Sequence, residues 1–214
     1  MRTRVKICGC TSVADVALAV DAGADAVGVI LAERSERAVS IARFREIAAG
    51  VPALVTLVAV FVDPASSLVD EALKAGAIPQ FHGDESADAC EAFAAGPYLK
   101  AYHVCAGAPQ TEAAFDAFAR PFERATWLFD AADAAGVSGG TGRTFAWEIA
   151  RELAGSRRFV VSGGLTPVNV GDCVRESRPY AVDVRSGVET NGVKDPDKVR
   201  AFVRAVREAD EVPA

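Results

Sequence analysis

Short hydrophobic runs alternate along the whole chain with segments whose apolar residues recur at helical spacing. Several of the runs are almost continuously apolar, which is typical of parallel strands covered on both faces. The predicted strands are Arg4–Cys8, Ala26–Leu31, Leu54–Val62, Ile78–Phe81, Leu99–Val104, Thr126–Asp130, Arg158–Ser162 and Ala181–Val184.

A helical segment follows each predicted strand, and this succession implies parallel pairing because every return crossover needs a helix. We therefore predict an α/β protein, a (β/α)8 TIM barrel that forms a single domain over residues 1–214. The alternative is a doubly wound open sheet, which usually has fewer strands. The predicted helices are Val13–Asp21, Ile41–Ala49, Ser66–Lys74, Ala87–Ala94, Glu112–Ala119, Phe145–Leu153, Pro167–Arg175 and Pro196–Glu208.

Glycine and proline positions support the predicted ends and starts of several helices. Gly23 and Gly76 come just after two predicted helices, where glycine often adopts the left-handed conformation that ends a helix. Asp63 and Thr166 each precede a proline, a pairing typical of a helix N-cap.

Composition narrows the possible functions. A net charge of −6 and an isoelectric point near 5.0 argue against a general nucleic-acid binder, although backbone N–H groups can still bind an anionic substrate. The apolar stretches are too short to span a membrane, and residues 1–4 lead into a strand without the apolar region of a signal peptide. We expect no membrane or nucleic-acid partner, and either a monomer or a homodimer.

The cysteines indicate free thiols. Their number is odd and their spacing supplies neither a disulfide framework nor a complete zinc site, so we expect no metal and a reducing, cytoplasmic location. The five are Cys8, Cys10, Cys90, Cys105 and Cys173.

Two separate predicted strands each end in a residue that can exchange a proton. Cys8 ends the first strand and Asp130 ends the sixth, and the strand ends of such a barrel meet at one mouth. A helix N-terminus after Gly9 would lower the pKa of the Cys8 thiol, whereas the plain alternative is a small buried hydrophobe. Asp130 would have to retain its proton through burial or a nearby negative charge, and the alternative is a loop cap.

Glycine-rich loops follow the last two predicted strands. Gly163 and Gly164 follow the seventh strand, and Ser186 and Gly187 follow the eighth. Barrels of this kind often bind phosphate between these loops, because glycines let the backbone approach the anion. The alternative is that the glycines only make tight turns.

Three further residues follow strands. Arg37 would pair a substrate carboxylate through its planar guanidinium, unless it is one more solvated charge. His82 is a candidate for the mouth of the barrel or a structural histidine. His103 has no motif around it and is treated as structural. The loop Ala131–Val137 is a candidate for closure over substrate.

Taken in order, these motifs resemble the phosphoribosylanthranilate isomerase family of tryptophan biosynthesis. The resemblance covers the chain from Lys6 to about Val206 and rests on six stretches: KICGCT, SERAVS, QFHGDE, LFDA with SGGTGRTFAW, SGGLTPVNV and VDVRSGVETNGVKDPDKV. Each stretch is weak evidence alone, but six in the family's order are specific.

The resemblance implies an Amadori rearrangement of N-(5-phosphoribosyl)anthranilate without a cofactor. It implies that Cys8 is the general base and Asp130 the general acid. Arg37 would hold the anthranilate carboxylate, His82 would line the mouth, and the loops with Gly163, Gly164, Ser186 and Gly187 would anchor the phosphate.

Two rival functions stay open. One is an isomerase for a related phosphosugar, such as the histidine-pathway substrate, but that enzyme typically has an aspartate where Cys8 stands; indole-glycerol phosphate synthase needs a lysine constellation that we do not find. The other is a non-catalytic phosphosugar-binding paralogue, which the retention of Cys8 and Asp130 argues against.

The chain departs from the family pattern at a few positions. Ala146 stands where aspartate is usual, Glu36 where proline is common, Tyr102-His103 where Ile-Arg is more usual, and Arg185 where serine or asparagine is usual.

Because Arg185 adds a positive charge beside the predicted phosphate loop, we expect Arg185→Ser to raise the Michaelis constant and to weaken its dependence on salt. Steady-state kinetics at several ionic strengths measure both. An unchanged Michaelis constant with unchanged salt dependence would contradict a phosphate-binding role for Arg185.

Overall fold

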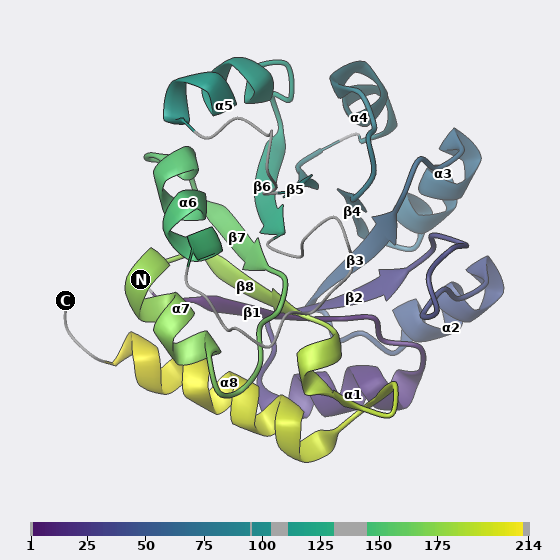
Figure 1. The fold of residues 1–214 in the computed structure, drawn as a ribbon. Helices are drawn as coiled ribbons and strands as arrows, with labels where there is room; N and C mark the ends of the chain where they lie inside the picture. Colours follow the sequence, from purple (N-terminus) through teal and green to yellow (C-terminus); the bar gives the residue numbers. More distant parts are fainter. Residues whose placement is uncertain (1, 95, 104–110, 131–144, 212–214) are drawn as a thin grey trace. The chain divides into compact units, whose positions relative to one another are not determined.

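Eight strands, β1 to β8, form a closed barrel in chain order in this computed structural model, which describes residues 2–94, 96–103, 111–130 and 145–211 (Figure 1). A helix follows each strand in the chain, so the predicted (β/α)8 barrel is confirmed and the open sheet was the wrong alternative. The strands are β1 Arg4–Cys8, β2 Ala26–Ile30, β3 Thr56–Phe61, β4 Ile78–Phe81, β5 Tyr98–His103, β6 Ala125–Asp130, β7 Phe159–Ser162 and β8 Ala181–Val184. The helices are α1 Val13–Ala22, α2 Ile41–Ala49, α3 Ser66–Lys74, α4 Ala87–Phe93, α5 Glu112–Ala119, α6 Phe145–Ala154, α7 Val170–Ser177 and α8 Pro196–Asp210.

The residues fall into two compact units. The first unit comprises Met1–Val5, Tyr102–Arg120 and Trp127–Ala214, and the second comprises Lys6–Ala101 and Pro121–Thr126. The division separates the candidate residues near the N-terminus from those near the C-terminus. A single domain over residues 1–214 stays a prediction.

In the second unit, the parallel pairing of β1, β2 and β3 sets which residues share a face. Cys8 lies opposite Gly28 in β2, and Gly28 lies opposite Val58 in β3. Cys8 and Val58 belong with Ile30 and Val60 to one buried apolar cluster. The register therefore brings the predicted catalytic thiol into the packed interior of this unit.

In the first unit, aromatic side chains form the packing between β5, β6 and α5. Tyr102, Phe115, Trp127 and Phe129 lie with ring centroids 5.0–6.3 Å apart, mostly edge to face. Such geometry is favourable for aromatic rings because the positive edge of one meets the negative face of another. The cluster packs the C-terminal ends of β5 and β6 against α5, and Asp130 is the last residue of β6.

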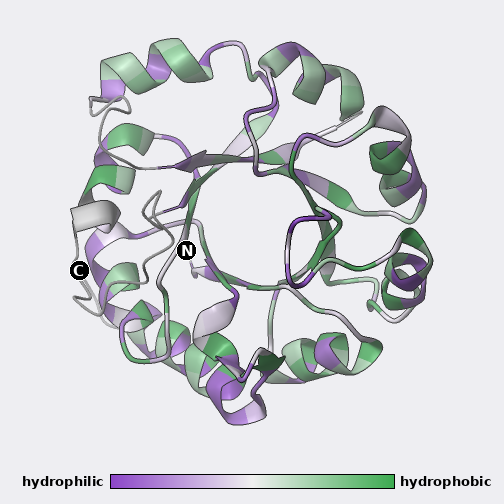
Figure 2. Ribbon diagram, turned by 45° about the vertical axis from the view of Figure 1, so that its right-hand side comes forward, coloured by the Kyte–Doolittle hydropathy of each residue, from purple (hydrophilic) through white to green (hydrophobic). Residues whose placement is uncertain are grey.

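Helix α8 illustrates how the helices are built. Its buried residues recur at intervals of three and four, which is the spacing of one helical face: Val199, Phe202, Val203, Val206 and Ala209. Figure 2 shows the same mixture of hydrophobic and hydrophilic residues in the other helices. In the first unit, Asp210 at the end of α8 accepts hydrogen bonds from the backbone N–H and the hydroxyl of Thr3, at 2.7 and 2.8 Å.

No helix among the described residues is long and apolar enough to cross a membrane.

The predicted glycine stops are correct, but two predicted N-caps are wrong. Gly23 and Gly76 have φ of 94° and 83°, in the left-handed region. Helix α3 begins at Ser66, because Asp63 takes a left-handed conformation (φ 45°) in the preceding loop. Helix α7 begins at Val170, with Asn169 and not Thr166 as its N-cap residue.

The structure also corrects the third strand and adds elements that hydrophobicity did not indicate. Leu54 is apolar but 98% exposed, and the Val55 N–H bonds to the Pro52 carbonyl in a turn, so β3 begins only at Thr56. After β8, the chain forms a short 3-10 helix, η1 (Ser186–Val188), and a hairpin of β9 (Glu189–Thr190) and β10 (Val193–Lys194). These pieces are too short for periodicity to indicate.

A buried ion pair ties together the loops after β3 and β4. The Lys100 ammonium lies 2.9 Å from the Glu85 carboxylate, and both side chains are almost fully buried. Lys100 also donates to the Gly83 carbonyl at 2.6 Å, while Glu85 accepts from the backbone N–H groups of Asp63 and Gly83. One carboxylate thus holds two loops, and one ammonium neutralises it.

We expect Lys100→Met to destabilise the protein by about 3–5 kcal/mol, because it leaves a buried carboxylate without its cation. Urea unfolding measures the loss, and the double variant Glu85→Gln/Lys100→Met should recover part of it. Lys74→Met, which removes an exposed partner of Glu71, is the matched control and should change stability little. Equal effects of Lys100→Met and Lys74→Met would show that burial of the pair is unimportant.

Candidate functional site

The end of β1 supplies the candidate base. Side chains alternate across a strand, so Ile7, which is fully buried, points to the opposite face from Lys6 and Cys8. Cys8 is 5% exposed, and Gly9 after it has φ 75°, a left-handed conformation that glycine adopts without strain. Helix α1 begins at Val13, a few residues further on. The predicted strand-end position of Cys8 is confirmed, in a more apolar setting than the sequence indicated.

Arg37 lies in a loop after β2 that folds back on the strand. The Val39 N–H bonds to the Ile30 carbonyl at 3.0 Å, and Ala38 pairs with Ile30 as a parallel bridge. Within the loop, the Arg37 N–H bonds to the hydroxyl of Ser35 at 3.2 Å. Arg37 is half-buried, and its role in binding a carboxylate stays a prediction.

His82 follows β4 and is held on two sides. Its backbone N–H bonds to the Phe61 carbonyl at 2.9 Å, and its Nδ1 atom lies 3.1 Å from the amide nitrogen of Gln80. If Gln80 donates to Nδ1, the neutral ring carries its proton on Nε2 and presents a donor away from the strand. The loop that follows is the one fixed by Glu85 and Lys100.

In the first unit, Asp130 ends β6 with only 9% of its surface exposed. Its neighbour Phe129 packs into the aromatic cluster, and alternation turns Asp130 to the other face of the strand. Asp130 pairs in register with Ser162 of β7. Asp130 therefore lies where the sequence predicted it, as a buried carboxyl at the end of a strand.

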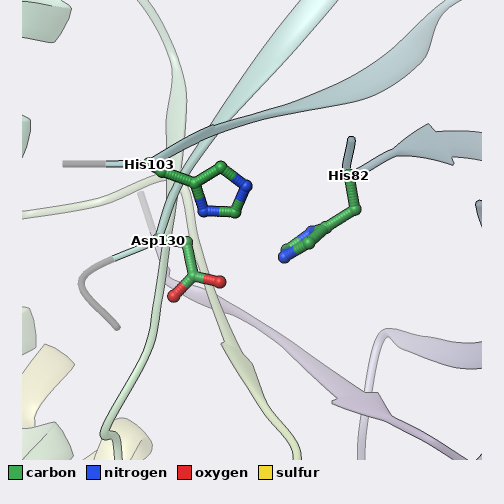
Figure 3. Close-up of side chains that lie close together, drawn as sticks. All are labelled: His82, His103 and Asp130. Atoms are coloured by element: carbon green, nitrogen blue, oxygen red, sulfur yellow. The ribbon is translucent and has the colours of Figure 1, made fainter. Parts of the chain in front are cut away.

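His103, which has no motif around it and was predicted to be structural, lies beside Asp130. Figure 3 shows the imidazole of His103, at the end of β5, next to the carboxyl group of Asp130, and their ligand atoms lie within 4.8 Å. His103 is exposed. Among the described residues of the first unit, one imidazole and one carboxylate lie here, fewer than the three or four ligands of a zinc site.

The loops after β7 and β8 lie against each other within the first unit. A side chain at Gly187 would place its Cβ atom 1.8 Å from the Leu165 carbonyl oxygen, so only glycine fits. Gly163 and Gly164 have φ of 86° and 64°, which turn the chain sharply after β7. Ser186 begins η1 and is exposed beside Gly187. The four residues predicted for phosphate therefore come from two loops in contact.

Two side chains that the sequence did not single out hold these loops. Asn169 accepts from the Thr166 N–H at 2.7 Å and donates to the Gly164 carbonyl at 3.0 Å. The buried Lys194 ammonium bonds to the Arg185 carbonyl at 3.1 Å and to the Glu189 carboxylate at 2.8 Å. The Lys194 contacts depend on the hairpin after β8, and neither set of contacts leaves a periodic signal in the sequence.

Among the other cysteines, Cys90 and Cys173 are structural. Both are fully buried, and burial raises the pKa of each thiol to about 12, so neither forms a thiolate near neutral pH. The Cys10 thiol is also buried and lies 3.7 Å from the Ile7 carbonyl. Cys8, Cys10, Cys90 and Cys173 are free thiols. Outside the described residues lie Cys105, the predicted mobile loop Ala131–Val137, and Gly139–Gly142.

The family model for N-(5'-phosphoribosyl)anthranilate isomerase matches residues 5–205. The N-(5'-phosphoribosyl)anthranilate isomerase of Pseudomonas fluorescens is 43% identical over 97% of both chains. That of Dechloromonas aromatica is 46% identical over 99% of both.

Solved structures agree. The phosphoribosyl anthranilate isomerase of Thermotoga maritima has a TM-score of 0.82 at 33% identity and covers 96% of this chain and 99% of its own. A phosphoribosyl anthranilate isomerase in complex with reduced 1-(o-carboxyphenylamino)-1-deoxyribulose 5-phosphate has a TM-score of 0.79 at 31% identity, with the same coverage. A structure of monomers derived from the dimeric T. maritima enzyme gives 0.78 at 31%, again with this coverage.

These matches span nearly the whole chain, and they include the strand ends that carry Cys8 and Asp130. The chain belongs to the N-(5'-phosphoribosyl)anthranilate isomerase family.

Proposed function

We propose that this protein isomerises N-(5'-phosphoribosyl)anthranilate to 1-(2-carboxyphenylamino)-1-deoxyribulose 5-phosphate, a step of tryptophan biosynthesis. The observation that carries the proposal is the family match over residues 5–205, in a chain that keeps both a thiol at the end of β1 and a carboxyl at the end of β6. A related isomerase binds the reduced form of this product, which supports the same substrate class here.

The reaction begins with ring opening. Asp130 gives its proton to the furanose ring oxygen of the substrate as the bond from that oxygen to C1 breaks. The electrons of the anthranilate nitrogen form the new C=N bond, which yields a Schiff base. As the general acid, Asp130 must hold its proton until the substrate is bound.

The second step is proton abstraction. The thiolate of Cys8 takes the proton from C2 of the sugar, and the electrons of that C–H bond move into the Schiff base. The resulting enolamine tautomerises to the ketone, so the product has the same atoms as the substrate. The imine accepts the electrons in this sequence, and we therefore expect neither a cofactor nor a metal.

Substrate binding is divided among the loops. Arg37, half-buried and held by its loop, pairs with the anthranilate carboxylate. His82 lines the mouth near the sugar, with its Nδ1 atom beside the side-chain amide of Gln80. The phosphate binds to the backbone of Gly163, Gly164, Ser186 and Gly187, where close loop packing supports a preorganised anion site.

Location and assembly are also part of the proposal. The free thiols described above support a reducing cytoplasm. A related enzyme is dimeric, and this chain is expected to be either a monomer or a homodimer. We expect a phosphorylated small molecule as the ligand, and no membrane or nucleic acid.

The central test is turnover of N-(5'-phosphoribosyl)anthranilate, prepared in situ, followed by the loss of anthranilate fluorescence. We expect Cys8→Ser and Asp130→Asn each to lower kcat by about 10²–10⁴-fold, because each removes one proton-transfer group. Circular dichroism and product-analogue binding serve as the controls for folding and for an intact site.

Each other outcome has a distinct meaning. Activity that survives Cys8→Ser would keep the reaction and move the base to another residue. Folded wild-type protein that binds the product analogue without turnover would indicate a silent binding paralogue. Turnover only of the histidine-pathway substrate would replace the proposed reaction with that one.

A second prediction concerns the phosphate loops. Gly187→Ala forces the two loops apart, since its Cβ atom would overlap the Leu165 carbonyl, and we expect the Michaelis constant to rise about tenfold or more. Inhibition by inorganic phosphate should weaken in parallel. Gly96→Ala is the control, because nothing lies within 4 Å of its added Cβ. Unchanged phosphate inhibition in Gly187→Ala would place the phosphate elsewhere.

A further inference from the structure

Lys6 is a buried cation on the same face of β1 as Cys8. It is 4% exposed, and the alternation of the strand turns it and Cys8 to one side while Ile7 faces the other. Burial disfavours the charge of a lysine, so its surroundings must stabilise the ammonium group. Lys6 stands two residues before the candidate base in the same strand.

Gly28 shows how near the two groups are. A Cβ atom built at Gly28 would lie 2.8 Å from the Cys8 sulfur and 3.0 Å from the Lys6 ammonium nitrogen. Both atoms lie close to the same point, so the sulfur and the ammonium nitrogen are at most about 6 Å apart. At that distance a positive charge favours the negatively charged form of a neighbouring group. Gly28 is paired in register with Cys8, and its missing side chain provides the room.

The buried Cys173 thiol shows what Cys8 would be without a nearby cation. Burial raises the pKa of Cys173 to about 12, which leaves it protonated and unable to act as a base. Cys8 is nearly as buried and sits in an apolar cluster with Ile30, Val58 and Val60. Desolvation would protonate it too, so a thiolate at this position needs a nearby positive charge.

We propose that the Lys6 ammonium holds Cys8 as the thiolate that the isomerisation requires. Lys6 is a positioning residue in this role: it neither exchanges a proton nor touches the substrate, and it acts through the charge of Cys8. The idea rests on the proposed function only for its consequence in turnover, because the state of the thiol can be measured without substrate.

The experiment follows thiolate formation by its ultraviolet absorbance as pH is raised. For each form of the protein, the spectrum of the matching Cys8→Ser variant is subtracted, which removes the other cysteines and the tyrosines. In the wild type we expect the Cys8 midpoint to lie below the ordinary thiol pKa of about 8.5. A wild-type midpoint at or above that value overturns the proposal without any change at Lys6.

Lys6→Met keeps the length of the side chain and removes its charge. We expect the Cys8 midpoint to rise by about one to two pH units, and the acidic limb of the kcat/KM profile to rise by the same amount. Lys6→Arg retains the charge and should keep the midpoint near that of the wild type. Lys74→Met, which removes an exposed lysine, should move neither quantity.

The outcomes separate the possibilities. A midpoint unmoved in folded Lys6→Met, or moved equally by Lys6→Met and Lys6→Arg, overturns the proposal because charge is then not the cause. If Lys6→Met does not fold, the wild-type midpoint and the Lys6→Arg comparison still decide. The protein could also have a low wild-type midpoint that Lys6→Met raises and yet turn over no phosphoribosylanthranilate. That result would support the effect of Lys6 on Cys8 and would refute the proposed reaction.

Discussion

The alternation of side chains across a β-strand is the constraint on which this structure depends. A residue buried toward the helices forces its neighbours onto the opposite face, so Ile7 sets the direction of Lys6 and Cys8, and Phe129 sets that of Asp130. A shift of one residue in either strand would turn the thiol or the carboxyl into the layer of helices. The apolar packing that stabilises each unit therefore also aims its candidate chemical groups.

Buried charged side chains fix the conformations of several loops, which apolar packing alone cannot do. Glu85 and Lys100 fix the loops after β3 and β4, and Lys194 with Glu189 fixes the loop after β8. In each pair the lysine also bonds to a backbone carbonyl of the loop, so charge neutralisation and loop geometry come from the same side chain. Because a buried charge that loses its partner is costly, such pairs restrict these loops to few conformations. Catalytic loops benefit from this restriction because binding groups must be in place before the substrate arrives.

The buried lysines lie beside different chemical groups. Lys100 pairs with Glu85 and Lys194 pairs with Glu189, and the Lys6 ammonium lies near the Cys8 thiol, which is a candidate for chemistry. Burial raises the pKa of a thiol and makes it inert, as Cys173 illustrates. A nearby cation lowers the pKa of a thiol, and this is the effect that we propose for Lys6 on Cys8.

The sequence by itself determined the succession of strands and helices, the strand ends at Cys8 and Asp130, and the family, because hydrophobic periodicity and ordered motifs are local properties of the chain. Tertiary structure decided that Leu54 stays outside β3, since burial and not hydrophobicity ends a strand. It also decided the start of α7, the hairpin after β8, and the proximity of His103 to Asp130. These features arise where register brings separate strands together or where one side chain bonds to a distant backbone group, and no local pattern encodes such long-range pairings.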